Sequence, residues 1–252
     1  MTNTMPVRLR REPLIEAVWE VRFSSDHPAA SELLTGLVLQ HLKAKPSDVV
    51  KLPTSNIPAV LRERDANLRY VATIQVRGDR YSAGIGERCV FLSSTRPYAG
   101  WLEFRKTILD LMKLLKESQL LTRPERFSLK YTDVLSHLKT PSLECLALKF
   151  EFANRQLTTE PGQFRFEIER RGFVNGIHVA LPATLKVANG EEFTGVVLEI
   201  DTIYLWREPE NQAAFWTTME RQLDDAHEVN KMIFFQDLLT RDTVDAHEPM
   251  FE

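Results

Sequence analysis

Cysteine is scarce in this chain of 252 residues. The two cysteines, Cys89 and Cys145, lie in separate apolar stretches typical of buried, reduced thiols. The histidines are scattered among different predicted elements, and neither His-Glu pair is followed by a second histidine at zinc-site spacing. The six histidines are His27, His41, His137, His178, His227 and His247. We therefore expect no bound metal and no organic cofactor.

Long apolar runs are also missing. No stretch reaches the roughly 20 apolar residues that a membrane helix needs. Residues 1–11 are polar and then basic, unlike a signal peptide. These absences predict a bacterial-type cytoplasmic protein that makes no contact with a membrane.

Neither sign of charge dominates the whole chain. The net charge is −3 and the isoelectric point about 6.1, so no basic excess indicates a nucleic-acid partner. The charge is unevenly placed, however. Residues 208–252 hold eleven acidic and three basic residues, a net charge of −8, which leaves +5 for residues 1–207. Motifs of the common hydrolases, phosphate-binding loops, zinc proteases and dinucleotide enzymes are absent.

Alternating and helical apolar patterns divide the first half into elements. They predict strands at 13–23, within 48–61, and at 68–76, 81–85 and 89–93, and helices at 28–43 and 97–119. The second helix carries an apolar stripe that includes Trp101, Phe104 and Ile108, and we expect this stripe to be buried.

The second half follows the same order without repeating the sequence. Its predicted elements are a strand around Phe127–Tyr131, a turn at Thr140-Pro141, strands at 146–152, 164–170, 177–181 and 195–206, and a helix from Pro209 toward 239. A turn is also expected at Asn189-Gly190. Trp216, Met219 and Leu223 form the apolar stripe of this helix. Residues 240–252 form an acidic tail.

These patterns predict an α+β fold of two similar units, residues 1–123 and 124–252, or one continuous domain. Each unit has the order strand, helix or turn, four strands, long helix. The sheet should be largely antiparallel, with the long helices packed on one face. The same order occurs in the duplicated saddle fold of TATA-binding proteins, an analogy of fold that allows a saddle-like arrangement and carries no function.

Polar side chains alternate with apolar ones along the predicted strands. The candidate binding residues on this outer face are Glu20, Arg22, Lys130, Arg165, Glu199 and Asp201. Mixed charges on a sheet face form cross-strand pairs, and they also suit a polar binding surface. An alternative is a carboxylate site that joins Asp133 to Glu199 and Asp201. Such a site needs a histidine, a metal or a lysine of low pKa beside it.

The acidic C-terminal helix is a second candidate surface. Its apolar stripe predicts docking, so Asp224, Asp225 and Glu228 should point outward or across to the basic body. Outward, they would form a patch for a basic partner. If they point across to the body, they would cover its cations and prevent residues 1–207 from binding nucleic acid.

Three stretches resemble a family. Pro13 to Phe23, P-L-I-E-A-V-W-E-V-R-F, resembles the P-L-x-E-A-x-x-E-x-x-F opening of an uncharacterised, sporadically distributed bacterial family of about this length. Arg126 to Asp133 is similar to its R-x-x-L-R-Y-x-N strand, with Lys130 in place of arginine and Asp133 in place of asparagine. Leu223 to Phe235 resembles its L-x-x-x-H-x-x-x-x-x-x-F helix. The resemblance implies no established activity, and the scattered occurrence suggests mobile elements or phage-defence loci.

The sequence thus favours a non-enzymatic binding or interaction protein. Its expected partner is another protein, encoded nearby, and a homo-oligomer is compatible with the pattern. One alternative is a nucleic-acid-binding module, which the basic body and the Arg8–Arg11 arm favour and the carboxylates on the strand faces oppose. The other is an enzyme of unrecognised type with a carboxylate site.

Overall fold

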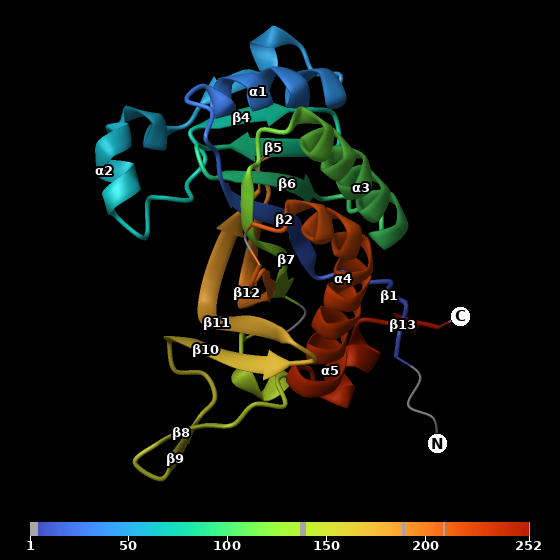
Figure 1. Cartoon of the computed structure of the whole chain (residues 1–252). Helices are drawn as coiled ribbons and strands as arrows, with labels where there is room; N and C mark the ends of the chain where they lie inside the picture. The colour runs from blue at the N-terminus through green and yellow to red at the C-terminus, as the bar shows by residue number, and fades with distance from the viewer. Residues whose placement is uncertain (1–4, 137–139, 188–189, 209, 252) are drawn as a thin grey trace. The chain divides into compact units, whose positions relative to one another are not determined.

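The computed structural model describes residues 5–136, 140–187, 190–208 and 210–251. The chain is mixed α+β, with a large antiparallel sheet and a long helix packed against it (Figure 1). This confirms the predicted fold class.

Nine strands form the large sheet, in the order β10-β11-β12-β7-β2-β6-β5-β4-β3. Their bounds are β2 Leu14–Ser24, β3 Val49–Lys51, β4 Ile74–Arg77, β5 Tyr81–Ile85, β6 Cys89–Thr95, β7 Arg123–Leu135, β10 Gly162–Arg170, β11 Phe173–Lys186 and β12 Glu192–Leu205. In each half of the chain, the first strand is hydrogen-bonded to the last. β2 neighbours β6, and β7 neighbours β12, so the strand order is similar in the two halves.

Helices, short turns and two small pairs of strands lie between and after the strands of the large sheet. The helices are α1 Ala30–His41, α2 Ala59–Arg64, α3 Trp101–Ser118, α4 Gln212–Met232 and α5 Arg241–Ala246, and η4 (Ile233–Leu238) is a π-helical turn after α4. Short 3₁₀ turns are η1 Pro46–Asp48, η2 Pro53–Asn56 and η3 Leu143–Cys145. Two further pairs of strands are β1 (Arg8–Leu9) with β13 (Pro249–Met250), and β8 (Phe150–Phe152) with β9 (Arg155–Leu157).

Contacts group the chain into two compact units. Unit 1 comprises residues 1–16, 130–202 and 225–252, and unit 2 comprises residues 17–129 and 203–224. The segments exchange in the middle of β2, β7, β12 and α4, so these long elements contribute residues to both units. The division of the sequence at residue 123 stays a prediction, and the compact units do not follow it.

Unit 2 is built around β4, β5 and β6, on which α1 and α3 lie (Figure 1). The stripe of α3 is buried from Phe104 to Leu115, as its spacing predicts. Trp101 is the exception, because it is the first residue of the helix and lies only partly buried. α3 begins after Gly100, whose φ of +95° breaks the helical path, rather than at the predicted Pro97.

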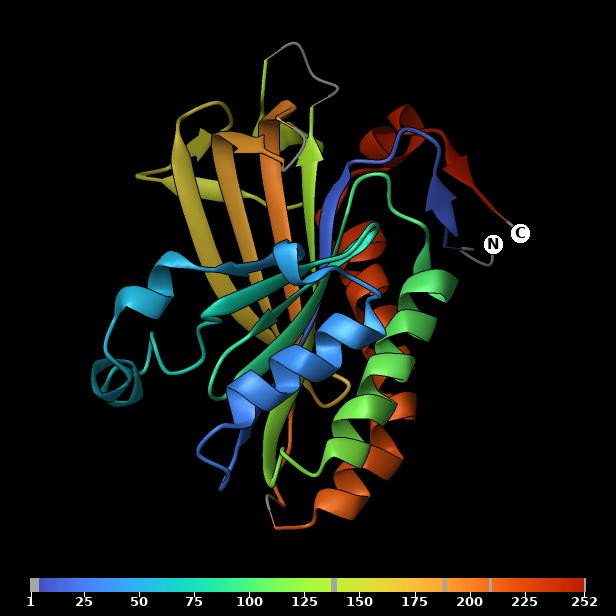
Figure 2. The same ribbon diagram turned by 90° about the horizontal axis from the view of Figure 1, so that it is seen from above.

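Unit 1 holds β10, β11 and most of β12, which run side by side in both views (Figures 1 and 2). A buried polar chain links them to α4. The amide of Asn230 donates to Ile200 O and Thr202 Oγ1, both at 3.0 Å, and Thr202 donates to Asn175 Oδ1 at 2.9 Å. Asn175 donates in turn to two backbone carbonyls. The network fixes the position of α4 on these strands.

Three predicted strands form only in part. Within residues 48–61 the predicted edge strand is β3, and the rest forms η1, η2 and the start of α2, because prolines at 46, 53 and 58 suit the first turn of a helix. Only 74–77 of the strand expected at 68–76 forms, since the amides of Leu68 and Arg69 bond back to Asp65 O. In 146–152 only β8 is a strand. The predicted roles of Pro209, His137 and Asn189 fall outside the described residues.

Candidate functional site

The outer face of β2 in unit 2 carries a network of arginines and carboxylates. Glu20 Oε1 accepts hydrogen bonds from Arg22 Nε at 2.6 Å and from Arg126 at 3.2 Å. The two predicted residues Glu20 and Arg22 therefore meet, and Arg126 of β7 joins them. The arrangement is that of paired charges on a sheet face.

The network extends from β2 toward the loop before β4. Arg22 lies over the ring of Tyr70, with its guanidinium carbon 4.5 Å from the ring centre. The Tyr70 hydroxyl donates to Glu125 at 2.5 Å, and burial, together with this carboxylate, raises the pKa of Tyr70. Ser24 also donates to Glu125, at 2.9 Å, and accepts from Arg88 at 2.7 Å. Each carboxylate here therefore has its own donors.

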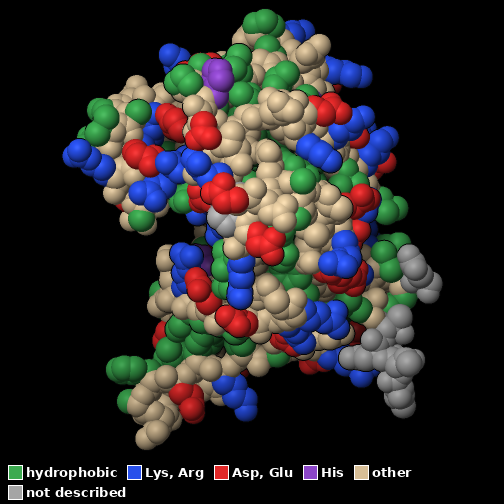
Figure 3. Space-filling view, viewed as in Figure 1, with side chains coloured by type: hydrophobic (Ala, Val, Ile, Leu, Met, Phe, Trp, Pro, Cys, Tyr) green, Lys and Arg blue, Asp and Glu red, His purple; other side chains and the backbone are tan. Residues whose placement is uncertain are grey.

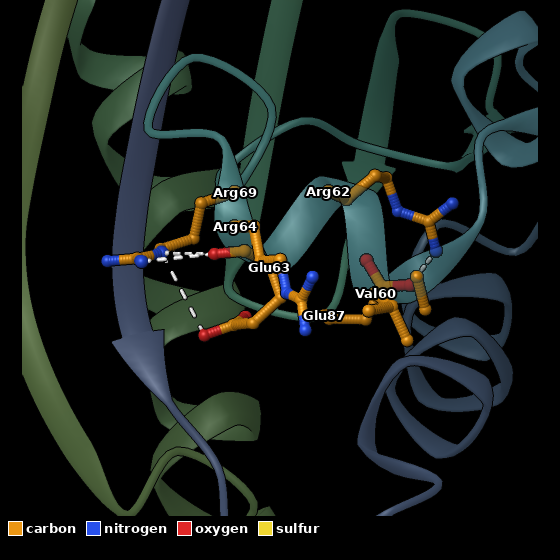
Figure 4. Close-up of a pocket in the computed structure, with 7 residues that line it drawn as sticks. Val60, Arg62, Glu63, Arg64, Arg69 and Glu87 are labelled. Atoms are coloured by element: carbon orange, nitrogen blue, oxygen red, sulfur yellow. Dashed lines mark hydrogen bonds and ion pairs between the residues drawn. The ribbon is translucent and has the colours of Figure 1, made fainter.

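A hollow of about 350 Å³ lies beside α2 (Figure 4). Its lining residues are Ala59, Val60, Arg62, Glu63, Arg64, Arg69 and Glu87. Figure 4 shows Arg69 turned toward Glu63 and Arg62 toward Glu87. Glu63 also receives a two-point contact from Arg88, at 2.7 and 2.8 Å. The lining thus holds three guanidinium groups and two carboxylates, so the hollow has an excess of positive charge.

The arginines of the hollow differ in how many hydrogen bonds and ion pairs they make. Arg62 is buried, with 7% of its surface exposed, and it donates to the carbonyls of Thr54 and Ile57 as well as to Glu87. Its Nε has no hydrogen-bond partner among the described residues. Arg64 is exposed, and no ion pair to its guanidinium occurs within the described ranges. Arg62 therefore holds α2 in place, and Arg64 is available for a ligand.

Two aliphatic side chains of α2 face solvent next to this charge. Val60 is 61% exposed and Leu61 is 54% exposed. The space-filling view shows hydrophobic and Lys or Arg side chains side by side over α2 (Figure 3). We call Val60, Leu61, Arg64 and the adjoining hollow the α2 surface.

The outer face in unit 1 carries a second, more polar hollow. Lys130 Nζ lies 3.5 Å from Glu199 Oε2, and Asp201 shares this face two residues further along β12. A hollow of about 430 Å³ adjoins Glu199 and is lined as well by Gln163, Phe164, Arg165 and His178. Arg165 and His178 occupy paired positions on β10 and β11. The structure therefore brings together Lys130, Arg165 and Glu199, which the sequence singled out, and adds His178.

The alternative carboxylate site is not assembled. Asp133 is three residues from Lys130 on β7, so its side chain leaves the opposite face of the strand from the Lys130–Glu199 pair. It is buried, with 5% of its surface exposed, and burial together with the charge of Glu12 raises its pKa to about 8. At neutral pH this carboxyl is largely protonated. It cannot act together with Glu199 and Asp201.

The acidic helix splits into paired and exposed carboxylates. Asp224 contacts Arg105 of α3 at 2.6 and 2.8 Å, and Glu220 contacts the same guanidinium at 3.1 Å. Asp225 and Glu228 are exposed on α4. The helix therefore covers one cation of the body and leaves two carboxylates to solvent.

Two histidines and both cysteines lie among protein groups that hold or bury them. The Tyr131 hydroxyl lies 3.0 Å from His227 Nδ1, and His247 Nδ1 lies 2.8 Å from the Thr243 carbonyl. Cys89 and Cys145 are free and buried, as predicted, and burial raises the pKa of both thiols. Within the described ranges, no group of three or more His, Cys, Asp or Glu side chains could hold a metal ion.

Comparison with known proteins assigns the chain to no family. No protein-family model and no curated protein matches the chain. None of the helices in the described part of the chain is long and apolar enough to span a membrane.

The α2 surface is what sequence reasoning missed. Residues 48–61 were assigned to an edge strand and loop, so the arginines that follow were not considered. A signal was present: Pro58 precedes Val60-Leu61 and the run Arg62-Glu63-Arg64, a helix start followed by apolar and then charged residues.

Proposed function

We propose that this chain is a non-enzymatic binding protein and that its α2 surface contacts a partner protein. The observation that carries the proposal is the combination on α2 of two exposed aliphatic side chains, Val60 and Leu61, with Arg64, whose guanidinium has no ion pair among the described residues. Protein interfaces are enriched in arginine beside apolar contacts, and their rims are polar.

The charges of the hollow favour a protein ligand over nucleic acid. Glu63 and Glu87 line it together with the arginines, and their carboxylates would repel a continuous phosphate backbone. A protein segment can place one carboxylate against Arg64 and an aliphatic side chain against Val60 without approaching Glu87. Arginine forms a two-point contact with a carboxylate, which supports recognition of an Asp or Glu side chain.

The arrangement of carboxylates supports binding rather than catalysis. Glu20, Glu63 and Glu125 each accept hydrogen bonds from arginine or hydroxyl donors, so each is held by structural contacts. Asp133 leaves the opposite face of β7 from the pair Lys130–Glu199. These carboxylates therefore serve structural contacts, which supports a binding role for the surface.

The resemblance to a sporadically distributed bacterial family supports a setting for this activity. In that setting the chain is an accessory component of a mobile-element or phage-defence system, and the partner is encoded nearby. The partner's contacting segment should carry acidic and aliphatic residues.

A random-peptide library displayed on phage tests the proposal on the immobilised full chain. We expect enrichment of peptides that combine Asp or Glu with Leu, Ile or Val. Arg64→Glu and Val60→Asp should each weaken binding at least about tenfold. Leu102→Asp is the matched control, because Leu102 is an exposed aliphatic residue, 80% exposed, on a different helix. Equal binding by all variants would refute the α2 surface. Salt-sensitive binding of oligonucleotides, abolished by Arg64→Glu, would replace the proposal with the nucleic-acid alternative.

A further inference from the structure

The two strands at the ends of the large sheet differ in how they are protected. β3 has three residues, includes Lys51, and is flanked by prolines at positions 46 and 53. Short length, lysine and proline are the features that keep an edge strand from pairing with another chain. β10 has nine residues and contains neither lysine nor proline. It therefore lacks the protection that β3 has.

The outer edge of β10 has unused hydrogen-bonding groups. All nine residues pair with β11, from Gly162 opposite Leu181 to Arg170 opposite Phe173. Among the described residues, β11 is the only strand hydrogen-bonded to β10. Alternate N–H and C=O groups of β10 point away from β11 and are free to pair with another strand.

The side chains of β10 separate into two faces. Gln163, Arg165, Glu167 and Glu169 are exposed on one face, and Phe164, Phe166 and Ile168 are half-buried on the other. No ion pair of Arg165, Glu167 or Glu169 occurs within the described ranges. Three charged side chains thus line the open edge without partners.

We propose that β10 pairs with β10 of a second copy of this chain, antiparallel, about a two-fold axis through Phe166. This register places Arg165 opposite the partner's Glu167, and Glu167 opposite the partner's Arg165. Gln163 then faces Glu169, and Phe164 faces Ile168, so each side of the joined sheet is complementary. The interface is isologous, as the common two-fold dimers require. The proposal goes beyond the proposed function and does not involve the α2 surface.

The charges also exclude the neighbouring registers. An axis through position 165 sets Arg165 against Arg165, and an axis through position 167 sets Glu167 against Glu167. Like charges directly opposite one another are destabilising. A register with the two-fold axis midway between two residues would set the polar face of one strand against the apolar face of the other. The register through Phe166 is therefore selected by the sequence of the strand.

Charge reversal with rescue tests the dimer. Sedimentation velocity on the full chain, from about 1 to 100 µM, should show a reversible monomer–dimer equilibrium. Arg165→Glu or Glu167→Arg alone creates two pairs of like charges across the axis, so each should raise the dissociation constant at least about tenfold. The double variant Arg165→Glu/Glu167→Arg restores both pairs with reversed polarity and should restore the dimer.

A matched control separates this interface from general charge effects. Lys51→Glu reverses an exposed charge on the other edge strand, β3, and should leave the equilibrium unchanged. Circular dichroism should show every variant folded. A wild-type chain that stays monomeric throughout the range would overturn the proposal. So would a dimer that ignores the single reversals, or single variants that the double variant does not rescue.

Discussion

Arg105 of α3 and Asp224 of α4 form a two-point ion pair, with Nε to Oδ1 at 2.6 Å and the second guanidinium nitrogen to Oδ2 at 2.8 Å. The hydrogen bonds that Arg105 donates to Asp224 raise the pKa of Arg105, and Glu220 adds a contact at 3.1 Å. The acidic helix therefore uses part of its charge inside the molecule. Only carboxylates such as Asp225 and Glu228 remain for a basic partner.

Loss of this ion pair should destabilise the fold modestly. Asp224→Asn or Arg105→Ala should each lower the free energy of unfolding by roughly 0.5–1 kcal/mol, since the pair is partly exposed. The pair energy should appear as coupling in a double-mutant cycle and shrink in 1 M salt. Asp225→Asn, one residue along on the exposed face, is the control and should be near neutral. Additive effects of the two variants would contradict the coupling.

The stripe of α3 should show a steep difference between Phe104 and Trp101. Phe104 is fully buried and packs against the rings of Tyr81 and Tyr98, with ring centres 6.0 Å apart in both pairs. Phe104→Ala should cost about 3–5 kcal/mol in urea unfolding. Trp101→Ala should cost clearly less, because the first residue of the helix is only partly buried. Equal costs would mean that Trp101 packs more closely than the structure places it.

The buried hydrogen bonds of Asn230 in unit 1 should contribute measurably to the free energy of unfolding. Asn230→Ala removes donors to Ile200 O and Thr202 Oγ1 and leaves both acceptors buried. We expect a loss of about 1–3 kcal/mol in the free energy of unfolding. Glu228→Ala, on the exposed face of the same helix, should change it by less than about 0.5 kcal/mol. A loss as small as that of the control would show that water replaces the amide.

The long, strongly patterned elements were predictable from the sequence. The strand from Pro13 to Phe23 and the stripe from Phe104 to Leu115 follow the 2-residue and 3.6-residue periods of elements with one buried face. The order of the strands within the sheet was not predicted, because pairing joins residues that are far apart in the sequence. Trp101 was misjudged because periodicity assigns a face and says nothing about where a helix begins.

The candidate site was predictable only in part. Glu20, Arg22, Lys130 and Glu199 alternate with core residues on long strands, so their exposure on the polar face follows from the pattern. The α2 surface is a six-residue helix in a proline-rich segment, too short to show a period. The contacts of Arg62 with Glu87 and of Arg88 with Glu63 join residues 25 positions apart, a proximity that local pattern cannot reveal.

Asp133 should make stability fall as the pH rises. Its carboxyl is buried near Glu12, and its pKa is raised from an ordinary 3.8 to about 8 in the folded chain. Between these values the folded state binds more protons than the unfolded state, so stability decreases with pH by up to about 1.4 kcal/mol per unit. Below pH 4 this cost is absent, and above pH 8 it is constant.

Asp133→Asn removes the titrating group and keeps a side chain of nearly the same shape. The variant should gain on the wild-type chain progressively from pH 5 to pH 8, by several kcal/mol in total, with no further gain above the folded pKa. Urea unfolding across this range measures the difference, and a carbon NMR titration of the Asp133 carboxyl measures the pKa directly. Glu12→Gln removes the second cause and should lower that pKa, whereas Asp225→Asn should give a difference independent of pH. A flat difference between Asp133→Asn and the wild-type chain would show that Asp133 is ionised and solvated in the folded state.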